Sequence, residues 1–291
     1  MGSAIATITP EQVREFDELG CLVVENALST EKVARLVSAL DHLTQHEPDR
    51  IHNIADILGL NDEFLDLIDL PTVLPKIRLF LGDNIWVNHS HLNVNPPPPP
   101  ESKKNSDIDY GWHRDGGAIN TDVPPPAPLL SIKVGFYLTD LSEPGCGQTY
   151  IIGGSHKSGE ALPDNHDLPP TAVPICVKPG TAVIYDRRMI HSIRSLNTSP
   201  ITRKAIFIQY AFRWLCPVDA MTVSSLRDRC SPARLQLLGL SAAYRTFDGA
   251  EGRSGRYYPT DLDVTIGKSA LSRFSRRIRS IPKRVVKKLR R

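Results

Sequence analysis

Between Asn84 and Trp214 the chain is a succession of short β-type runs separated by turns that contain glycine and proline. The turns include Glu143-Pro144-Gly145 and Lys178-Pro179-Gly180. Many short strands joined by such turns are typical of a β-sandwich or barrel. The sequence therefore predicts a mainly β core over about residues 84–215. The runs are Ile85–Val94, Ser131–Leu138, Gln148–Ile152, Thr181–Tyr185 and Ala205–Trp214.

Helices are predicted on both sides of this core. Thr9-Pro10-Glu11-Gln12 is a capping box with proline at the first helical position, and Gly20 ends that helix before a short strand, Cys21–Val24. Ser29 is placed to cap a second helix, and helix or loop is expected from there to about Phe80. Ser231-Pro232 is expected to begin a C-terminal helix that ends at Gly239.

Composition limits the compartment and the class of protein. The five cysteines are scattered and none forms a CxxC pair, which indicates reduced thiols and excludes a zinc knuckle. No apolar run approaches the ~18 residues that a membrane helix needs. The N-terminus lacks the basic and apolar segments of a secretory signal. We therefore expect a cytoplasmic protein with one domain over residues 1–267.

The last 24 residues differ from the rest. Residues 268–291 hold eleven lysines and arginines and no acid, whereas residues 1–267 carry 24 basic against 32 acidic residues. Apolar residues recur there at helical spacing, although Pro282 must interrupt any helix. One interpretation is a solvated, disordered tail without a role. The others are a peripheral anchor on an anionic membrane, or a contact with an acidic partner; we do not favour nucleic acid.

The stretch GWHRDGG (111–117) places His113 and Asp115 two residues apart. On a strand or at its end, side chains at i and i+2 lie on one face and can reach one metal ion. The best third ligand is His191, which closes the run Ala182–Ile190 and can point inward by strand alternation. Two histidines and one carboxylate form the facial triad of non-haem Fe(II) oxygenases. The alternative for each histidine is a purely structural role.

Arg203 strengthens the metal hypothesis. It follows His191 by twelve residues and stands at the start of the strand-like run Lys204–Tyr210. A guanidinium group matches a carboxylate with a planar fork of donors, and an uncompensated arginine inside a barrel is costly. Arg203 therefore predicts an anionic ligand, such as the distal carboxylate of 2-oxoglutarate.

Over roughly residues 8–240 the chain resembles the phytanoyl-CoA hydroxylase-like (phytanoyl-CoA dioxygenase) family of Fe(II)/2-oxoglutarate-dependent dioxygenases. The resemblance rests on WHRD (112–115), YLTDLSEPGCGQTYIIGGSHKSG (137–159), His191 and RKAIF (203–207), with entry helices in 8–33. It implies a double-stranded β-helix (a cupin-like jelly roll) with N-terminal and C-terminal helices. Two positions depart from the family pattern: Arg114 stands where many members have glutamine, and Gly153-Gly154 replaces Pro-Gly.

The resemblance also implies roles for individual residues. His113, Asp115 and His191 would be the metal ligands and the catalytic residues, and Arg203 would bind the C5 carboxylate of 2-oxoglutarate. His91 and Asn93 are candidates for its C1 end, and Thr149 is a further inward polar residue of the cofactor site. His156 is expected to be structural. The loops 95–110 and 117–130 are the expected substrate contacts.

The implied activity is an oxygenase reaction. The protein would hydroxylate or otherwise oxidise an unactivated C–H bond of a small-molecule, lipid-like or natural-product substrate, and would release succinate and CO₂. Its cofactors would be Fe²⁺, 2-oxoglutarate and O₂, with ascorbate as a candidate reductant. The alternatives are a non-catalytic metal-binding member of the same fold and a cupin-like metalloenzyme such as an isomerase. Arg203 favours the oxygenase, and Asp115 argues against the halogenating relatives, which lack that carboxylate.

Overall fold

The computed structural model of the chain describes residues 8–98, 109–116, 123, 127–193 and 197–241. The basic segment 268–291, most of the proline-rich loop and most of the 117–130 loop lie outside these residues. Within the described part, no helix is both long and apolar enough to cross a membrane.

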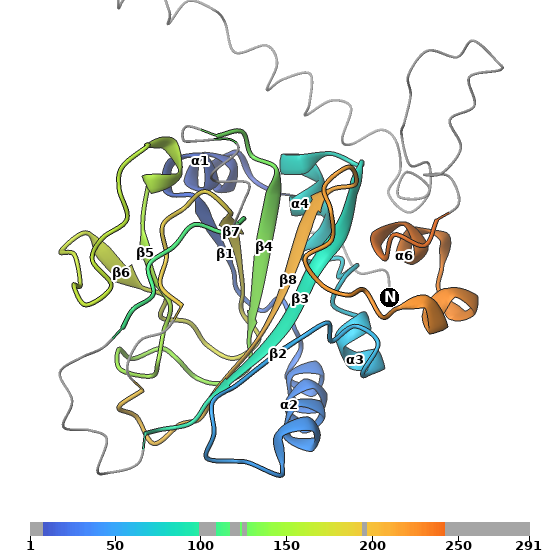
Figure 1. Ribbon diagram of the computed structural model, residues 1–291, viewed down its shortest axis with the longest axis horizontal. Helices are drawn as coiled ribbons and strands as arrows, with labels where there is room; N and C mark the ends of the chain where they lie inside the picture. The colour runs from blue at the N-terminus through green and yellow to red at the C-terminus, as the bar shows by residue number, and fades with distance from the viewer. Residues whose placement is uncertain (1–7, 99–108, 117–122, 124–126, 194–196, 242–291) are drawn as a thin grey trace, which may run out of the picture.

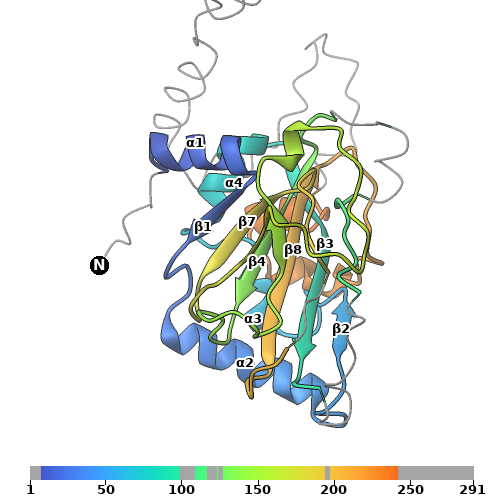
Figure 2. The same cartoon turned by 90° about the vertical axis from the view of Figure 1, so that its left-hand side faces the viewer.

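A six-stranded antiparallel sheet forms the centre of the fold, in the order β1-β7-β4-β8-β3-β2. Figure 1 shows β5 and β6 on one side of this sheet and the helices α2, α3 and α6 on the other. Figure 2, turned by 90°, shows β1, β7, β4, β8, β3 and β2 side by side across the sheet. The strands of the large sheet are β1 (Cys21–Val24), β2 (His52–Ala55), β3 (Ile85–Asn95), β4 (Ser131–Tyr137), β7 (Ala182–Asp186) and β8 (Arg203–Phe212).

A second, smaller sheet faces the large one. It consists of β5 (Tyr150–Ile152) and β6 (Ala172–Pro174), and two single-residue bridges extend it. Ile151 of β5 bridges to His191, and His191 bridges to His113. Two facing sheets with flanking helices are the predicted double-stranded β-helix, and the mainly β fold class is confirmed.

Helices α1, α2 and α6 begin where the local signals placed them. Thr9 caps α1 with both hydrogen bonds of the capping box, and Gly20 ends it with a positive φ of 82°. Ser29 caps α2 through the backbone N–H of Lys32, and Ser231 caps α6 in the same way. The helices are α1 (Pro10–Leu19), α2 (Thr30–Thr44), α3 (Asp62–Leu65), α4 (Leu74–Leu81) and α6 (Pro232–Leu237), with short 3₁₀ turns at Ser155–Lys157 and Ser224–Arg229.

The main apolar core lies between the helices and one face of the large sheet. Val134, Ile184 and Ile208 stand side by side across β4, β7 and β8, and each is fully buried. They belong to one cluster with Leu36 and Leu40 of α2. Burial of these side chains supplies the driving force that packs the helices onto the sheet. The opposite face of the large sheet does not belong to this apolar core.

That opposite face carries polar side chains, because side chains alternate along each strand. Lys133 of β4 pairs with Tyr185 of β7 and Gln209 of β8, and Gln209 pairs with His89 of β3. The next cross-strand row contains Gly135, Phe207 and His91, and the row after it contains Tyr137, Ala205 and Asn93. These three rows form the wall that faces the second sheet.

Two elements differ from the sequence prediction. Strand β2 was not predicted, since its four residues, HNIA, carry little β-type signal and alternate only between half-buried and exposed. The run Ala182–Ile190 is not one strand: β7 ends at Asp186, whose carboxylate accepts the backbone N–H and the Nε–H of Arg188 at 2.9 Å each. This side-chain turn redirects the chain, so His191 joins the second sheet instead of closing β7.

Candidate active site

His113 and His191 are adjacent residues of the second sheet. Each backbone N–H donates to the carbonyl of the other at 3.0 Å, and the ring centroids lie 4.2 Å apart. Each ring nitrogen Nδ1 lies 3.0 Å from a backbone carbonyl two residues earlier, that of Gly111 for His113 and that of Met189 for His191. A carbonyl can only accept, so Nδ1 carries the proton in both rings. Both Nε2 atoms are thereby available as metal ligands.

Asp115 completes the cluster. One carboxylate oxygen lies 3.8 Å from Nε2 of His113, and the other lies 3.8 Å from Nε2 of His191. The three candidate ligand atoms all lie within 4.8 Å of one another. The structure therefore brings together the three residues that the spacing predicted, two from a bridged pair and one from the turn that follows His113. Two imidazoles and one carboxylate fit a facial Fe(II) site with its other face open.

The charges around the cluster suit metal binding. Burial alone would raise the pKa of Asp115, but Lys133, His191 and His113 outweigh it and hold that pKa well below its usual range. Burial, reinforced by His113, lowers the pKa of His191 to about 4. At neutral pH the site thus offers an ionised carboxylate and a neutral His191 imidazole, which is the protonation state that a divalent metal requires.

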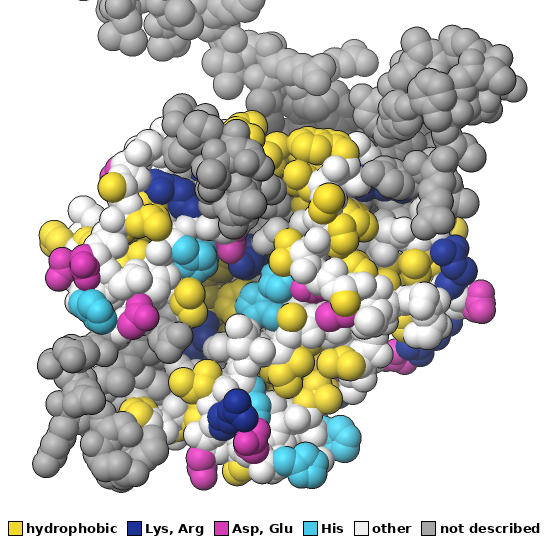
Figure 3. Space-filling view, viewed as in Figure 1, with side chains coloured by type: hydrophobic (Ala, Val, Ile, Leu, Met, Phe, Trp, Pro, Cys, Tyr) yellow, Lys and Arg dark blue, Asp and Glu magenta, His cyan; other side chains and the backbone are white. Residues whose placement is uncertain are grey.

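A cavity of about 230 Å³ opens beside the cluster. Its walls combine His113 and His191 of the cluster with polar side chains from the large sheet. Figure 3 shows the corresponding face of the molecule, hollowed near its centre, with histidine and basic side chains around the hollow. The other lining residues are Asn53, His91, Asn93, Lys133, Thr149, Tyr185, Ser192, Ile193, Arg203 and Phe207.

Arg203, the first residue of β8, lines the same cavity and is buried. Its guanidinium donates to Asn93 Oδ1 at 2.5 Å and to Thr149 Oγ1 at 3.3 Å, both of them neutral groups. Within the described residues no carboxylate forms an ion pair with it, and its buried Nε has no hydrogen-bond partner. A buried cation held by neutral side chains requires an anion from outside. Asn93 and Thr149 thus hold Arg203, while His91 faces the cavity.

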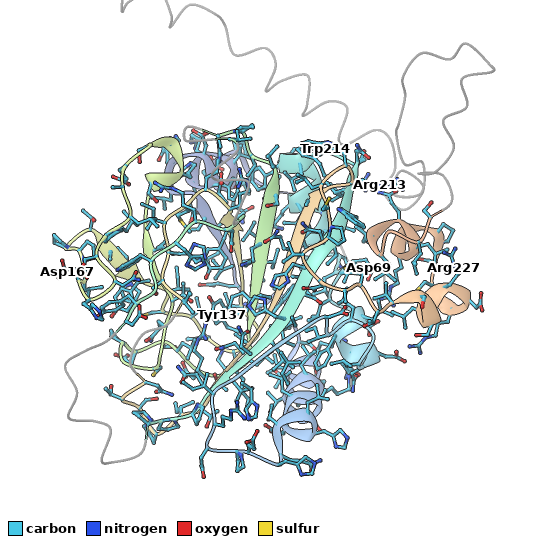
Figure 4. The ribbon with its side chains drawn as sticks, in the orientation of Figure 1. Asp69, Tyr137, Asp167, Arg213, Trp214 and Arg227 are labelled. Atoms are coloured by element: carbon cyan, nitrogen blue, oxygen red, sulfur yellow. The ribbon has the colours of Figure 1, made fainter. Side chains whose placement is uncertain are left out.

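The aromatic floor of the cavity also orients Arg203. The guanidinium lies 5.8 Å from the ring of Tyr137 and 5.9 Å from that of Phe207, within cation–π range. The hydroxyl of Tyr137 meets that of Tyr185 at 2.5 Å, and burial raises the pKa of Tyr185 well above its usual value. Figure 4 shows Tyr137 in the interior, between the large sheet and the segments opposite it. The phenol of Tyr185 is therefore a neutral partner.

Two other residues of the motifs lie outside the cavity. His156 donates through Nε2–H to the carbonyl of Asp17, 2.9 Å away, and packs against Gly20, so it has the expected structural role of holding α1. Arg114 donates to the carbonyls of Arg188 and Glu160, at 3.0 and 2.9 Å. Neither contributes a ligand atom to the cluster.

Sequence reasoning missed Lys133, whose ammonium group pairs with Asp115. A signal was present, since Lys133 is the one charged residue in the apolar strand SIKVGFY. It also missed that His89 and Asp219 connect to His91. Asp219 lies in an irregular segment after β8, and nothing in its local sequence links it to β3.

Comparison with known proteins agrees with this site. The phytanoyl-CoA dioxygenase (PhyH) family profile matches residues 16–205, well over half of the chain. The chain belongs to the phytanoyl-CoA dioxygenase family. Membership makes it a 2-oxoglutarate-dependent dioxygenase whose cofactors are Fe(II), 2-oxoglutarate and O₂, and the His113–Asp115–His191 cluster fits the iron.

Individual relatives are more distant. The chain is 25% identical over 244 residues to an ectoine dioxygenase of Sphingopyxis alaskensis, covering 70% of this chain and 76% of the relative. It is 21% identical to an ectoine dioxygenase of Nocardia farcinica, covering 69% and 76%.

Two solved structures show the same fold. One is EctD of S. alaskensis with 2-oxoglutarate and 5-hydroxyectoine, with a TM-score of 0.56 at 23% identity, covering 70% of this chain and 76% of that one. The other is HygX of Streptomyces hygroscopicus with nickel and 2-oxoglutarate, with a TM-score of 0.59 at 18% identity, covering 76% and 94%.

Proposed function

We propose that this dioxygenase hydroxylates a C–H bond of a small organic molecule in the cavity beside His113, Asp115 and His191. These three side chains would hold the iron, and the C5 carboxylate of 2-oxoglutarate would pair with Arg203. The metal supplies O₂ activation coupled to loss of CO₂ from 2-oxoglutarate. The observation that carries the proposal is the buried guanidinium without a carboxylate partner, in the same cavity as the metal cluster.

The protein's own side chains act mainly by position. The Nδ1–H bonds of His113 and His191 to backbone carbonyls direct both Nε2 atoms to one point. Asn93, Thr149 and the Tyr137 ring fix the guanidinium so that its fork is ready for a carboxylate. Arg203 and His191 are themselves buried, which strengthens the electrostatic contacts that they make.

The test is an anaerobic titration with Fe(II) and then 2-oxoglutarate, followed by admission of O₂. We expect a weak visible metal-to-ligand charge-transfer band on addition of 2-oxoglutarate, and succinate after O₂. An Arg203→Met variant should bind Fe(II) normally and give the band only at far higher 2-oxoglutarate concentration. Binding of both ligands without succinate, in the presence of any substrate, would instead identify a non-catalytic binding protein.

The substrate is to be found by assay. Ectoine is the first compound to test, because the relatives in the comparison are named ectoine dioxygenases. Lipid-like and natural-product compounds form the second set. Substrate-dependent succinate release and a product 16 mass units heavier identify the substrate.

Residues 268–291 add a separate proposal, in which the basic segment holds a cytoplasmic enzyme at an anionic membrane or an acidic partner.

A further inference from the structure

A chain of three side chains leads from the segment after β8 into the cavity. The carboxylate of Asp219, of which only 2% is exposed, forms a short contact with Nδ1 of His89. Nε2 of His89 lies 2.9 Å from Nδ1 of His91, and His91 lines the cavity. The two rings are 4.8 Å apart, and that of His91 stacks on Phe207. Binding of the metal requires none of these contacts.

The hydrogen bonds from Asp219 through His89 to His91 all run in one direction, which the carboxylate of Asp219 determines. An ionised carboxylate only accepts, so His89 must carry its proton on Nδ1. In neutral His89 the Nε2 atom is then an acceptor, and the 2.9 Å contact requires a proton on Nδ1 of His91. Neutral His91 therefore presents an unprotonated Nε2 to the cavity, and this atom has no hydrogen-bond partner among the described residues.

His91 lies between the two ends of the proposed co-substrate site. His91 pairs with Phe207 of β8, which lies four residues along that strand from Arg203. Two residues farther along β8, Gln209 pairs with Lys133. Lys133 in turn contacts Asp115. A 2-oxoglutarate that joined the metal to Arg203 would pass beside His91. An unprotonated ring nitrogen repels such a dianion, whereas an imidazolium would attract it.

The charges around His91 come from several elements. Burial, Lys133 and His89 lower its pKa well below the usual value, with a smaller effect in that direction from Arg203 and an opposing one from Asp115. Asp56, after β2, is turned away, and its carboxylate accepts hydrogen bonds from the backbone N–H and hydroxyl of Thr222. The ring is thus neutral while the cavity holds no anion, and an incoming dianion adds a negative charge that opposes this effect.

We propose that binding of 2-oxoglutarate draws one proton from solvent onto Nε2 of His91, and that the chain through His89 to Asp219 stabilises the resulting charge. The inference rests on the proposed function. No bond of 2-oxoglutarate is made or broken in this step, and the added proton balances part of the incoming negative charge. Asp219 and His89 are positioning residues, and His91 is the group that meets the ligand.

The substitution Asp219→Asn tests the direction of the chain. The backbone N–H of Ser90 donates to Asp219 Oδ2 at 2.6 Å, so the amide oxygen of the variant must face Ser90 and its NH₂ must face His89. The NH₂ group donates to Nδ1 of His89, which moves the proton of that ring to Nε2 and reverses the next bond. Neutral His91 then carries its proton on Nε2 and can donate to an anion without taking up a proton.

The measurement is titration calorimetry of the anaerobic, metal-loaded protein with 2-oxoglutarate, in two buffers with different ionisation enthalpies. The wild type should take up about one proton per 2-oxoglutarate, and its Kd should rise up to about tenfold per pH unit above neutrality. Asp219→Asn should bind with almost no proton uptake and with a Kd nearly independent of pH. Asp56→Asn is the matched control and should behave as wild type. Asp56 contacts the same segment after β8, but at Thr222 instead of through Asp219.

The outcomes separate the two proposals. A wild type that binds metal but not 2-oxoglutarate refutes the proposed function. A wild type that binds 2-oxoglutarate without proton uptake overturns the inference and leaves that function standing. Uptake that persists unchanged in Asp219→Asn overturns the role of the chain. Should that variant not fold, His91→Gln serves instead, because it has no titrating ring and must abolish the uptake.

Discussion

Replacement of Lys133 by methionine tests how the buried charges of the site are balanced. The lysine side chain is 12% exposed, that of Asp115 is 7% exposed, and the two form an ion pair. Methionine keeps most of the aliphatic stem and removes the ammonium group. In the metal-free protein Asp115 then loses its largest favourable partner. Removal of one member of a buried pair costs about 3–5 kcal/mol.

The expected result depends on the metal. For a domain of this size, a loss of about 3 kcal/mol lowers the Tm of the metal-free protein by about 6–12 °C. A bound divalent ion replaces the missing positive charge at Asp115, so the loss should shrink to about 1 kcal/mol or less with saturating Co(II). By the thermodynamic cycle, the remaining ~2 kcal/mol appears as Co(II) binding about 30-fold tighter in the variant.

The assay is thermal unfolding with and without Co(II), together with direct titration of the metal. Lys76→Met is the matched control: Lys76 is also buried, but it lies on α4 and donates to the carbonyl of Thr72 at 3.0 Å. Its effect should be the same with and without metal. Equal destabilisation of metal-free and metal-loaded Lys133→Met would refute the electrostatic reasoning and leave only a packing role for Lys133.

The other predictions concern the rest of the cavity and the ends of the chain. Arg203→Lys should raise the Kd of 2-oxoglutarate about 10- to 100-fold without changing metal affinity, since the bidentate fork is lost; unchanged 2-oxoglutarate affinity would place the C5 carboxylate elsewhere. Gly135→Ala should destabilise the protein by about 1–3 kcal/mol, because its Cβ would lie 2.8 Å from the ring of Phe207; denaturant unfolding measures this, and a neutral effect would contradict the packing. His191 binds a proton more readily when unfolded, since its folded pKa is about 4. Metal-free stability should therefore fall as pH decreases from about 6.5 to 4, by up to about 3 kcal/mol from His191, and His191→Gln should lose this share of the slope while the share of buried His91 remains. Deletion of residues 268–291 should abolish sedimentation with anionic vesicles and leave turnover of a soluble substrate unchanged; equal pelleting of both forms would exclude the membrane anchor.

Local features of the fold were readable in the sequence because their causes are local. The capping box at Thr9, the left-handed Gly20 and the caps at Ser29 and Ser231 each depend on a few neighbouring residues. The metal cluster was also accessible, since His113 and Asp115 are two residues apart. Arg203 was found by its chemistry, as a cation at the start of a mostly apolar run.

Features that depend on how distant segments pair could not be predicted from the sequence. His191 was expected to point inward by strand alternation along Ala182–Ile190, but the Asp186–Arg188 turn places it in the second sheet, paired with His113. Lys133 was unpredicted as a neighbour of Asp115 because that contact joins the large sheet to the turn after His113. The connection from Asp219 to His89 spans 130 residues of sequence. Such contacts follow from how distant segments align, and a single sequence does not specify that alignment.

The backbone pairing of His113 with His191 has a consequence for folding kinetics. The two residues are far apart in the sequence, so the metal site cannot exist until the intervening chain has closed into a loop. Contacts of such long range form slowly and are typical of late steps in β-rich proteins. The absorption spectrum of cobalt bound at this site would then report when the two sheets dock. In a stopped-flow refolding experiment it should develop after the far-ultraviolet signal of α1 and α2.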